Sequence, residues 1–360
     1  MLKKKAQMGC IILALAAAIA MVIISPAHAV DFKISGQIDR AAMYADDGDT
    51  AKWFFVDNDN SSTRFRFTGS NDFEDNWKVG IVWEVEMQSD PSNTVNMEDG
   101  GSDFGDVHFD ERKMEFWVEK WGRMWLGQGD TASNNTSEVD LSGTTVAAYS
   151  SVTDVGGGFL FKDNGDTILK ADGTPYTVGN TRNNFDGLSR KDRVRYDTPK
   201  FYGAYASGSV GNNSIWDAAL NYAADFGWAK FAAAGAWADG GTSQSWDGQF
   251  SSSASILFDF GLNFTASYAM RDQNGKDPWN IFGKVGYQFL EKHAASVQWS
   301  RTENYSAKDD KGDSFNIAYV FSPWQSVEFY GTYYLHMLDR DQGSDPDDIN
   351  VFMTGGRVKF

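Results

Sequence analysis

The 360-residue sequence predicts an all-β fold, a 16-stranded antiparallel transmembrane β-barrel, and two observations carry that prediction. Segments in which apolar and polar residues alternate recur along the chain, and the connections between them are short and long in turn. Strands with one face toward lipid and one toward water alternate with period two. Short turns at one end and long loops at the other are typical of an outer-membrane barrel. A soluble β-sandwich, the alternative, has no reason to sort its connections in this way.

The alternation is clearest at residues 77–87, 262–270 and 327–335, where every second residue is apolar. Counting all such segments gives an even number of strands, as expected for a bacterial barrel. The predicted strands are 32–44, 62–70, 77–87, 112–120, 123–128, 193–198, 201–210, 215–224, 228–237, 249–259, 262–270, 279–289, 293–302, 313–321, 325–336 and 349–360.

The amino terminus predicts export. Lys3, Lys4 and Lys5 precede an apolar run at 11–24 that ends in Ala-His-Ala, the pattern of a cleaved signal peptide. The alternative, an uncleaved anchor helix, is disfavoured because the apolar run is short for a membrane span. We therefore expect a signal peptide at 1–29 and a barrel domain at 30–360, located in the cell outer membrane. The one cysteine lies in the leader, so the exported part cannot form disulfides and needs a large core or a closed sheet.

Charge and hydropathy exclude other classes. Thirty-two Lys and Arg against 49 Asp and Glu give a formal charge of -17, which argues against a nucleic-acid partner. After the leader no stretch of about 18 apolar residues occurs, so helical spans are not expected.

A barrel of sixteen strands is wide enough to hold a water-filled lumen. The polar faces should then line water and the apolar faces should contact outer-membrane lipid and lipopolysaccharide. Aromatic residues near strand ends fit interfacial girdles, namely Tyr44, Trp77, Trp216, Trp237, Trp279, Trp299 and Tyr319.

Three segments resemble one known family. They are TRFRFTGSNDF at 63–73, RKMEFWVEKWGRMWLG at 112–127 and RVRYDTPKFYG at 193–203. Each is similar to strands of the general diffusion porins of Gram-negative bacteria, the trimeric 16-stranded type. The resemblance implies a passive channel for small hydrophilic solutes and ions, a homotrimer, and a third loop folded into the lumen, which corresponds to residues 129–192. The terminal Phe360 resembles the signal recognised by the barrel-assembly machinery.

A constriction with charges on two sides is expected from the pattern. Arg64, Arg66, Arg193 and Arg195 fall on the predicted lumen face, and the long connection carries Asp130, Glu138, Asp140 and Asp154. Further candidate lining residues are Asp39, Lys78, Glu84, Glu86 and Lys113. Opposed charges would create a transverse field that orients dipolar solutes. The alternatives are that these charges only solvate a wet face and that the connection is a mobile surface loop. Gln128 stands where the family often has Arg, so the resemblance does not carry over a full basic ladder.

No cofactor or catalytic site is expected. Acidic loops at 57–60 and 163–166 raise the question of bound calcium, but neither has the spacing of an EF-hand, and a solvated loop is favoured. An outer-membrane enzyme is disfavoured because His108, His293 and His336 lie on separate segments and no G-x-S-x-G motif occurs. A channel selective for a sugar or an anion remains the second alternative.

Overall fold

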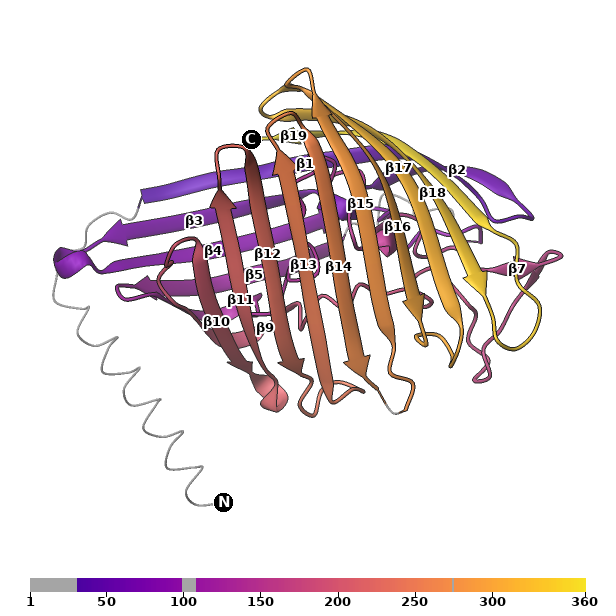
Figure 1. Cartoon of the computed structure of the whole chain (residues 1–360), viewed down its shortest axis with the longest axis horizontal. Helices are drawn as coiled ribbons and strands as arrows, with labels where there is room; N and C mark the ends of the chain where they lie inside the picture. Colours follow the sequence, from indigo (N-terminus) through magenta and orange to yellow (C-terminus); the bar gives the residue numbers. More distant parts are fainter. Residues whose placement is uncertain (1–30, 99–107, 274) are drawn as a thin grey trace, which may run out of the picture.

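The computed structural model describes residues 31–98, 108–273 and 275–360. Within them, seventeen strands form one antiparallel sheet that closes where β1 pairs with β19 (Figure 1). Because β2 and β3 both pair with β1 along different halves of it, they occupy one barrel position together. The barrel therefore has sixteen strand positions, and the predicted fold class is confirmed.

The described barrel strands have the following bounds: β1 (Asp31–Asp46), β2 (Ala51–Asp57), β3 (Arg64–Asp72), β4 (Lys78–Gln88), β5 (His108–Glu119), β6 (Arg123–Asp130), β9 (Arg190–Asp197), β10 (Ala204–Gly211), β11 (Trp216–Asp225), β12 (Ala229–Asp239), β13 (Gly248–Phe258), β14 (Leu262–Asp272), β15 (Trp279–Phe289), β16 (His293–Glu303), β17 (Lys311–Trp324), β18 (Val327–Asp339) and β19 (Ile349–Lys359). A two-stranded hairpin, β7 (Lys162–Asp163) and β8 (Asp166–Thr167), lies in the connection between β6 and β9.

Each predicted strand overlaps an observed one, with ends that differ by a few residues, and one strand was missed in a predicted loop. Residues 51–57 were expected in a connection but form β2, which extends the first hairpin. The residues between β2 and β3 leave the sheet as a short 3-10 turn, η1 (Asp59–Ser61). That interruption hid the strand, because it breaks the period-two pattern between its two halves.

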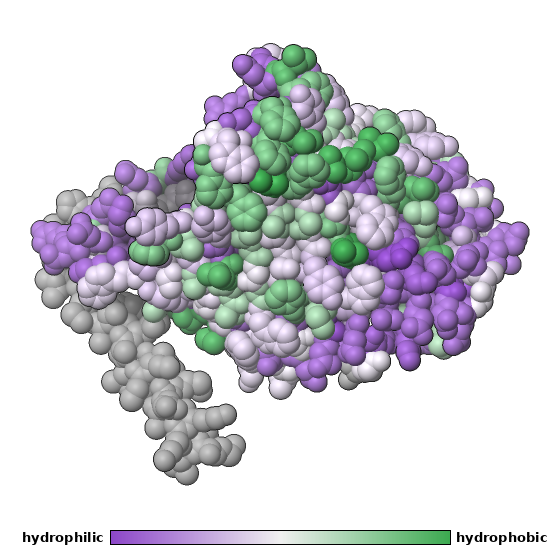
Figure 2. All heavy atoms as spheres, in the orientation of Figure 1, coloured by the Kyte–Doolittle hydropathy of each residue, from purple (hydrophilic) through white to green (hydrophobic). Residues whose placement is uncertain are grey.

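The two faces of the barrel wall differ as the alternation predicts. In β14, Asn263, Thr265 and Ser267 are buried toward the lumen, whereas Phe264 and Tyr268 are exposed on the outside. Figure 2 shows hydrophobic residues gathered over the strands and hydrophilic residues at the end that carries the β7 hairpin. Most of the predicted girdle aromatics are exposed on the outer face, including Trp77, Trp216, Trp237, Trp299 and Tyr319.

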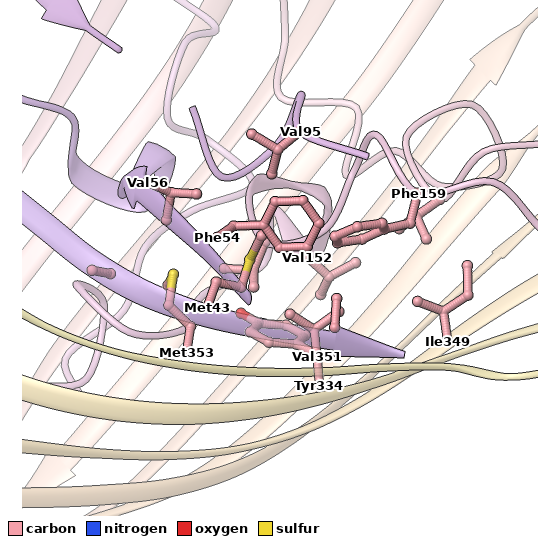
Figure 3. Close-up of a cluster of buried hydrophobic side chains, with 14 of the residues drawn as sticks. Met43, Phe54, Val56, Val95, Val152, Phe159, Tyr334, Ile349, Val351 and Met353 are labelled. Carbon is pink, nitrogen blue, oxygen red and sulfur yellow. The ribbon is translucent and has the colours of Figure 1, made fainter. Parts of the chain in front are cut away.

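One part of the inner wall is apolar, and there the expectation of a polar lumen is wrong. Figure 3 shows side chains from β1, β2, β18 and β19 packed against residues of the long connection. Phe54 of β2 meets Phe159 of that connection edge to face at 5.5 Å. Met43 and Met353 are fully buried in the same cluster. These strands are apolar on both faces because the lumen beside them is filled by protein and not by water.

No helix of the described residues is long and apolar enough to cross a membrane. The predicted signal peptide at 1–29 lies outside the described residues, and so do residues 99–107 of the second long connection.

Candidate functional site

Residues 131–189 connect β6 and β9, and much of this connection lies inside the barrel, whereas its β7–β8 hairpin projects at one end (Figure 1). Its backbone is held by small hydroxyl side chains on the inner wall: the N–H groups of Val139 and Leu141 donate to Ser253 and Ser255, each at 3.0 Å. Further along, the Thr144 hydroxyl meets that of Ser296 at 2.9 Å. Serine hydroxyls of β13 and β16 thus attach the loop to the inner wall, and the loop is not a surface loop.

A buried ion pair also fixes the loop. Nζ of Lys284 on β15 donates to the Asp140 carboxylate and to the carbonyl of Ala148, both at 2.7 Å. Both side chains are almost fully buried. Asp140 was predicted to line the pore, but it lies between the loop and the barrel wall and anchors the loop there.

A second in-folded segment, residues 89–98, packs on the first. The Gly156 N–H donates to the Ser92 carbonyl at 2.9 Å. Only Gly156 of the three consecutive glycines has a positive φ, at +81°, and makes the predicted bend. Gly157 and Gly158 have a different role. A Cβ on Gly157 would lie 2.8 Å from the Asn93 carbonyl oxygen, and a Cβ on Gly158 would clash with the Thr94 carbonyl. They allow the two loop backbones to approach closely.

Between the loop and the opposite wall lies a polar cavity of about 660 Å³. It is lined by five arginines from five barrel strands, Arg64, Arg112, Arg190, Arg271 and Arg357, and by two acids of the loop, Glu138 and Asp186. The formal charge of these seven residues is +3, five positive against two negative. Asparagines supply much of the remaining lining, namely Asn60, Asn134, Asn135, Asn183 and Asn184.

The arginines of β3 and β5 share their acids. Glu84 is completely buried and contacts Arg64 at 3.8 Å and Arg112 Nε at 3.1 Å, and it also pairs with Arg66. Glu86 pairs with Arg112. The carboxylates thus fix the guanidinium groups in place, so that the basic wall is rigid.

Arg112 was not predicted as a site residue. Strict alternation places it with Met114, which is exposed on the outer face. A register shift between Glu84 and Val85 inserts one extra residue into β5, and Arg112 turns inward. A period-two pattern does not reveal a bulge of this kind.

The predicted pair Arg193 and Arg195 holds the root of the loop. Arg193 is buried, pairs with Glu115, and donates through Nε to the Asp130 carbonyl at 2.9 Å. Arg195 donates to the Thr131 carbonyl at 2.8 Å and pairs with Asp197. Around them, Asp130 pairs with Lys113 and lies 3.5 Å from Arg190.

Three other predicted residues lie away from the cavity. Asp39 is buried beneath the loop and accepts from the Tyr330 hydroxyl at 2.6 Å. Lys78 faces Asp72 at 3.6 Å near the short-turn end of the barrel. Asp154 is enclosed in the loop. Of the thirteen predicted residues, Arg64 and Glu138 line the cavity, and the role of the set in selectivity stays a prediction.

The loop acids are buried, and this changes their protonation. Burial raises the pKa of Asp186 to about 6, although its carboxylate accepts the N–H groups of Asn135 at 2.6 Å and Ser137 at 2.8 Å. Burial likewise raises the pKa of Asp154 to about 7 and that of Glu138 well above its ordinary value. The acidic side of the cavity is therefore only partly charged near neutral pH.

Sequence reasoning also missed Arg190, Arg271, Arg357 and Asp186. Arg190 and Asp186 fall within the predicted connection 129–192, and Arg271 falls just past a predicted strand end, where alternation assigns no face. For the three arginines, the signal available was a positive charge near strand ends that meet a common lumen.

Neither described histidine ring is near the cavity. His293 bonds to the Tyr319 hydroxyl at 2.6 Å, and His336 lies between Ser314 and the Val155 carbonyl. In 31–98, 108–273 and 275–360, no three His, Cys, Asp or Glu side chains form a group that could hold a metal ion. The expectation that the acidic loops are solvated and hold no cofactor stays a prediction.

Comparison with known proteins gives one family. The family described as Gram-negative porin matches residues 14–341. No curated protein matches the sequence. Among solved structures, the anion-selective porin from Comamonas acidovorans is 14% identical with a TM-score of 0.64, covering 92% of this chain and 100% of that one. The trimer form of the Vibrio cholerae outer membrane protein OmpT is 15% identical with a TM-score of 0.55, covering 92% and 100%. A mutant of the Rh. blastica porin is 12% identical with a TM-score of 0.57, covering 91% and 100%. At such identities these structures support the fold.

Proposed function

This chain belongs to the Gram-negative porin family, and from that premise we propose how its outer-membrane diffusion channel works. Small hydrophilic solutes and ions cross through the polar cavity, where the in-folded loop narrows the lumen. The wall arginines and the loop acids face this space from different sides. Such an arrangement orients a dipolar solute and favours small hydrated ones.

The observation that carries this proposal is the restriction of the polar cavity to one side of the lumen. On the other side the loop and the walls of β1, β2, β18 and β19 form an apolar core. A solute therefore has to pass the charged cavity. Its selectivity depends on this local charge of +3 and not on the formal charge of -17 of the whole chain.

Planar-bilayer recordings test the channel. The purified protein should give stepwise single-channel conductance that grows with salt concentration. A protein that inserts, as judged by heat-modifiable migration on gels, and yet never conducts would contradict the proposal.

The channel carries out no chemistry in this proposal. The support is that the described histidines lie outside the cavity, bound to Tyr319 and to Ser314. Hydrolysis of phospholipid or peptide by the conducting protein, at a rate that survives further purification, would contradict this.

We further propose a homotrimer in contact with outer-membrane lipid and lipopolysaccharide, exported through removal of residues 1–29. The OmpT structure of similar fold is described as a trimer form. Conductance that closes in three equal steps would support a trimer, and a single closing step would contradict it. Amino-terminal sequencing of the protein from outer membranes would identify the cleavage site.

A further inference from the structure

Arg271 differs from the other arginines of the cavity, and we propose that it binds the carboxylate of small organic monoanions that enter the channel. It stands near the end of β14, on the eleventh strand position, whereas Arg64 and Arg112 stand on the second and fourth. All of them line the same cavity. This inference rests on the proposed channel function and adds a solute class to it.

The first argument is the absence of a protein counter-charge. Four of the cavity arginines have acid partners: Arg64 and Arg112 share Glu84, Arg190 lies beside Asp130, and Arg357 pairs with Glu328. Among the residues that the structure describes, Arg271 forms no ion pair, and no carboxylate acts on it. A largely buried guanidinium without an anion is costly, and a carboxylate from the solution offsets this cost.

The second argument is that the Arg271 guanidinium is already oriented. Its Nε donates to Gln249 Oε1 at 2.8 Å, and Gln249 is itself fixed by a 2.7 Å bond to the Phe185 carbonyl. The guanidinium carbon lies 4.7 Å from the ring centre of Phe185 and 4.9 Å from that of Trp246. The aromatic rings and the Nε bond hold the plane of the group, so little side-chain freedom is lost when a ligand binds.

This arrangement leaves the Nη groups as donors. The Tyr305 hydroxyl takes up part of this capacity through a side-chain hydrogen bond to Arg271, and the remaining Nη–H groups are open to a ligand. A planar guanidinium presents two parallel N–H groups, which match the two oxygens of a carboxylate. Asn183 and Asn184 line the same cavity and supply further amide donors.

The number of unpaired arginines favours a solute with a single negative charge, because the loop acids already have partners of their own. Glu138 and Asp186 share the cavity, and each already accepts hydrogen bonds, from Asn184 at 2.9 Å and from the Asn135 and Ser137 N–H groups. Among the cavity arginines that the structure describes, Arg271 alone lacks an acid partner, so a second negative charge on the solute would meet no further unpaired guanidinium. A monocarboxylate fits better than a dicarboxylate or a phosphate dianion.

The test measures block of chloride current through the full-length channel. Propionate should reduce the single-channel current saturably, and the isosteric propionamide should not. In Arg271→Gln the half-blocking propionate concentration should rise about tenfold, as expected for loss of a bidentate charged hydrogen bond. Arg271→Lys keeps the positive charge but lacks the two parallel N–H groups of a guanidinium. Its half-blocking propionate concentration should lie between those of the wild type and Arg271→Gln.

Arg301→Gln is the matched control. Its guanidinium is occupied by Asp313, with bonds of 3.0 and 2.9 Å, and it does not line the cavity. This variant should keep the wild-type propionate block. A wild-type channel that conducts chloride without saturable block by propionate would overturn the inference. The same follows if propionate blocks Arg271→Gln as well as the wild type. Absence of any conductance would instead overturn the channel function itself.

Discussion

At the scale of single residues, the cavity wall is a set of arginines whose positions are fixed by buried acids. Glu84 contacts Arg64, Arg66 and Arg112, so each guanidinium is held toward the lumen. A charge that is fixed in place acts on every passing ion, whereas a mobile one is averaged and screened. The wall should therefore set the ion preference.

Replacing Arg64 by Gln should increase cation preference. A unit charge about 7 Å from a passing ion changes its energy by about 0.6 kcal/mol even at the dielectric constant of water, with opposite sign for K⁺ and Cl⁻, so the K⁺/Cl⁻ permeability ratio should rise about sevenfold. The double variant Arg64→Gln, Arg66→Gln should shift it further. Reversal potentials in a salt gradient measure this ratio. An unchanged potential in the double variant would show that these arginines do not face the conducting path.

Acidification should increase anion preference, because the cavity loses negative charge. Burial raises the pKa of Asp186, which lines the cavity, to about 6, so this carboxyl is largely ionised at pH 8 and largely neutral at pH 5. The reversal potential should move toward the anion value between these pH values. Asp186→Asn should already lie nearer that value at pH 8 and should show a smaller change. A titration curve that is identical in this variant would contradict the assignment.

Residue-level prediction from the sequence succeeded where alternation holds. Arg64 was assigned to the lumen because Phe65 and Phe67 face the other way. Arg112 was not predicted to face the lumen, because the bulge opposite Glu84 and Val85 turns it to the other face of the strand. Arg271 was not predicted as a site residue, because its position in the cavity depends on contacts with Phe185 and Trp246. Those two residues belong to different loops, and no sequence spacing brings them together.

At the scale of elements, the in-folded loop is anchored and not merely enclosed. Hydroxyls of β13 and β16 hold its backbone, Lys284 holds Asp140, and Phe159 inserts among apolar side chains of the wall. Such a loop should keep one conformation while solutes pass, because its attachments are spread over many strands.

Lys284→Met tests the anchoring. It leaves the Asp140 carboxylate buried without a cation, a change that typically costs about 3–5 kcal/mol. The loop should partly detach, seen as faster cleavage within 131–189 by added protease and as noisier single-channel current. The double variant Lys284→Met, Asp140→Leu removes both charges and should largely restore resistance. Equal protease resistance in Lys284→Met and wild type would contradict the anchoring role.

The elements themselves were largely predictable, because each barrel strand has water or polar loop on one side and lipid on the other. The exceptions have a physical reason. β2 was missed because η1 interrupts the pattern. The apolar core that fills the lumen beside β18 and β19 was not predicted. Tyr334 and Val351 alternate with other large residues, and the sequence pattern does not reveal that the in-folded loop packs on them.

At the scale of the whole molecule, the barrel closes through its last residue. β1 and β19 pair from Gln37 with Lys359 to Asp46 with Asn350. Beyond them, the Gly36 and Phe360 backbones exchange hydrogen bonds of 2.9 and 3.0 Å. The Phe360 ring covers Gly36, where a Cβ would lie 2.6 Å from it. The side chain is nonetheless 64% exposed, so much of it remains available to another molecule.

Phe360→Ala should therefore affect assembly in cells more than stability. The backbone bonds that close the barrel do not need the ring, and loss of a mostly exposed side chain should cost about 1 kcal/mol or less in the free energy of unfolding. If the assembly machinery recognises the terminal aromatic residue, the amount of protein in the outer membrane should fall several-fold. Protein refolded into detergent should still unfold near the wild-type urea concentration. Val358→Ala is the control, since Val358 is also half exposed, lies two residues away and retains the terminal ring. A parallel drop of both variants in cells, or a large loss of stability after refolding Phe360→Ala, would assign the residue to barrel closure instead.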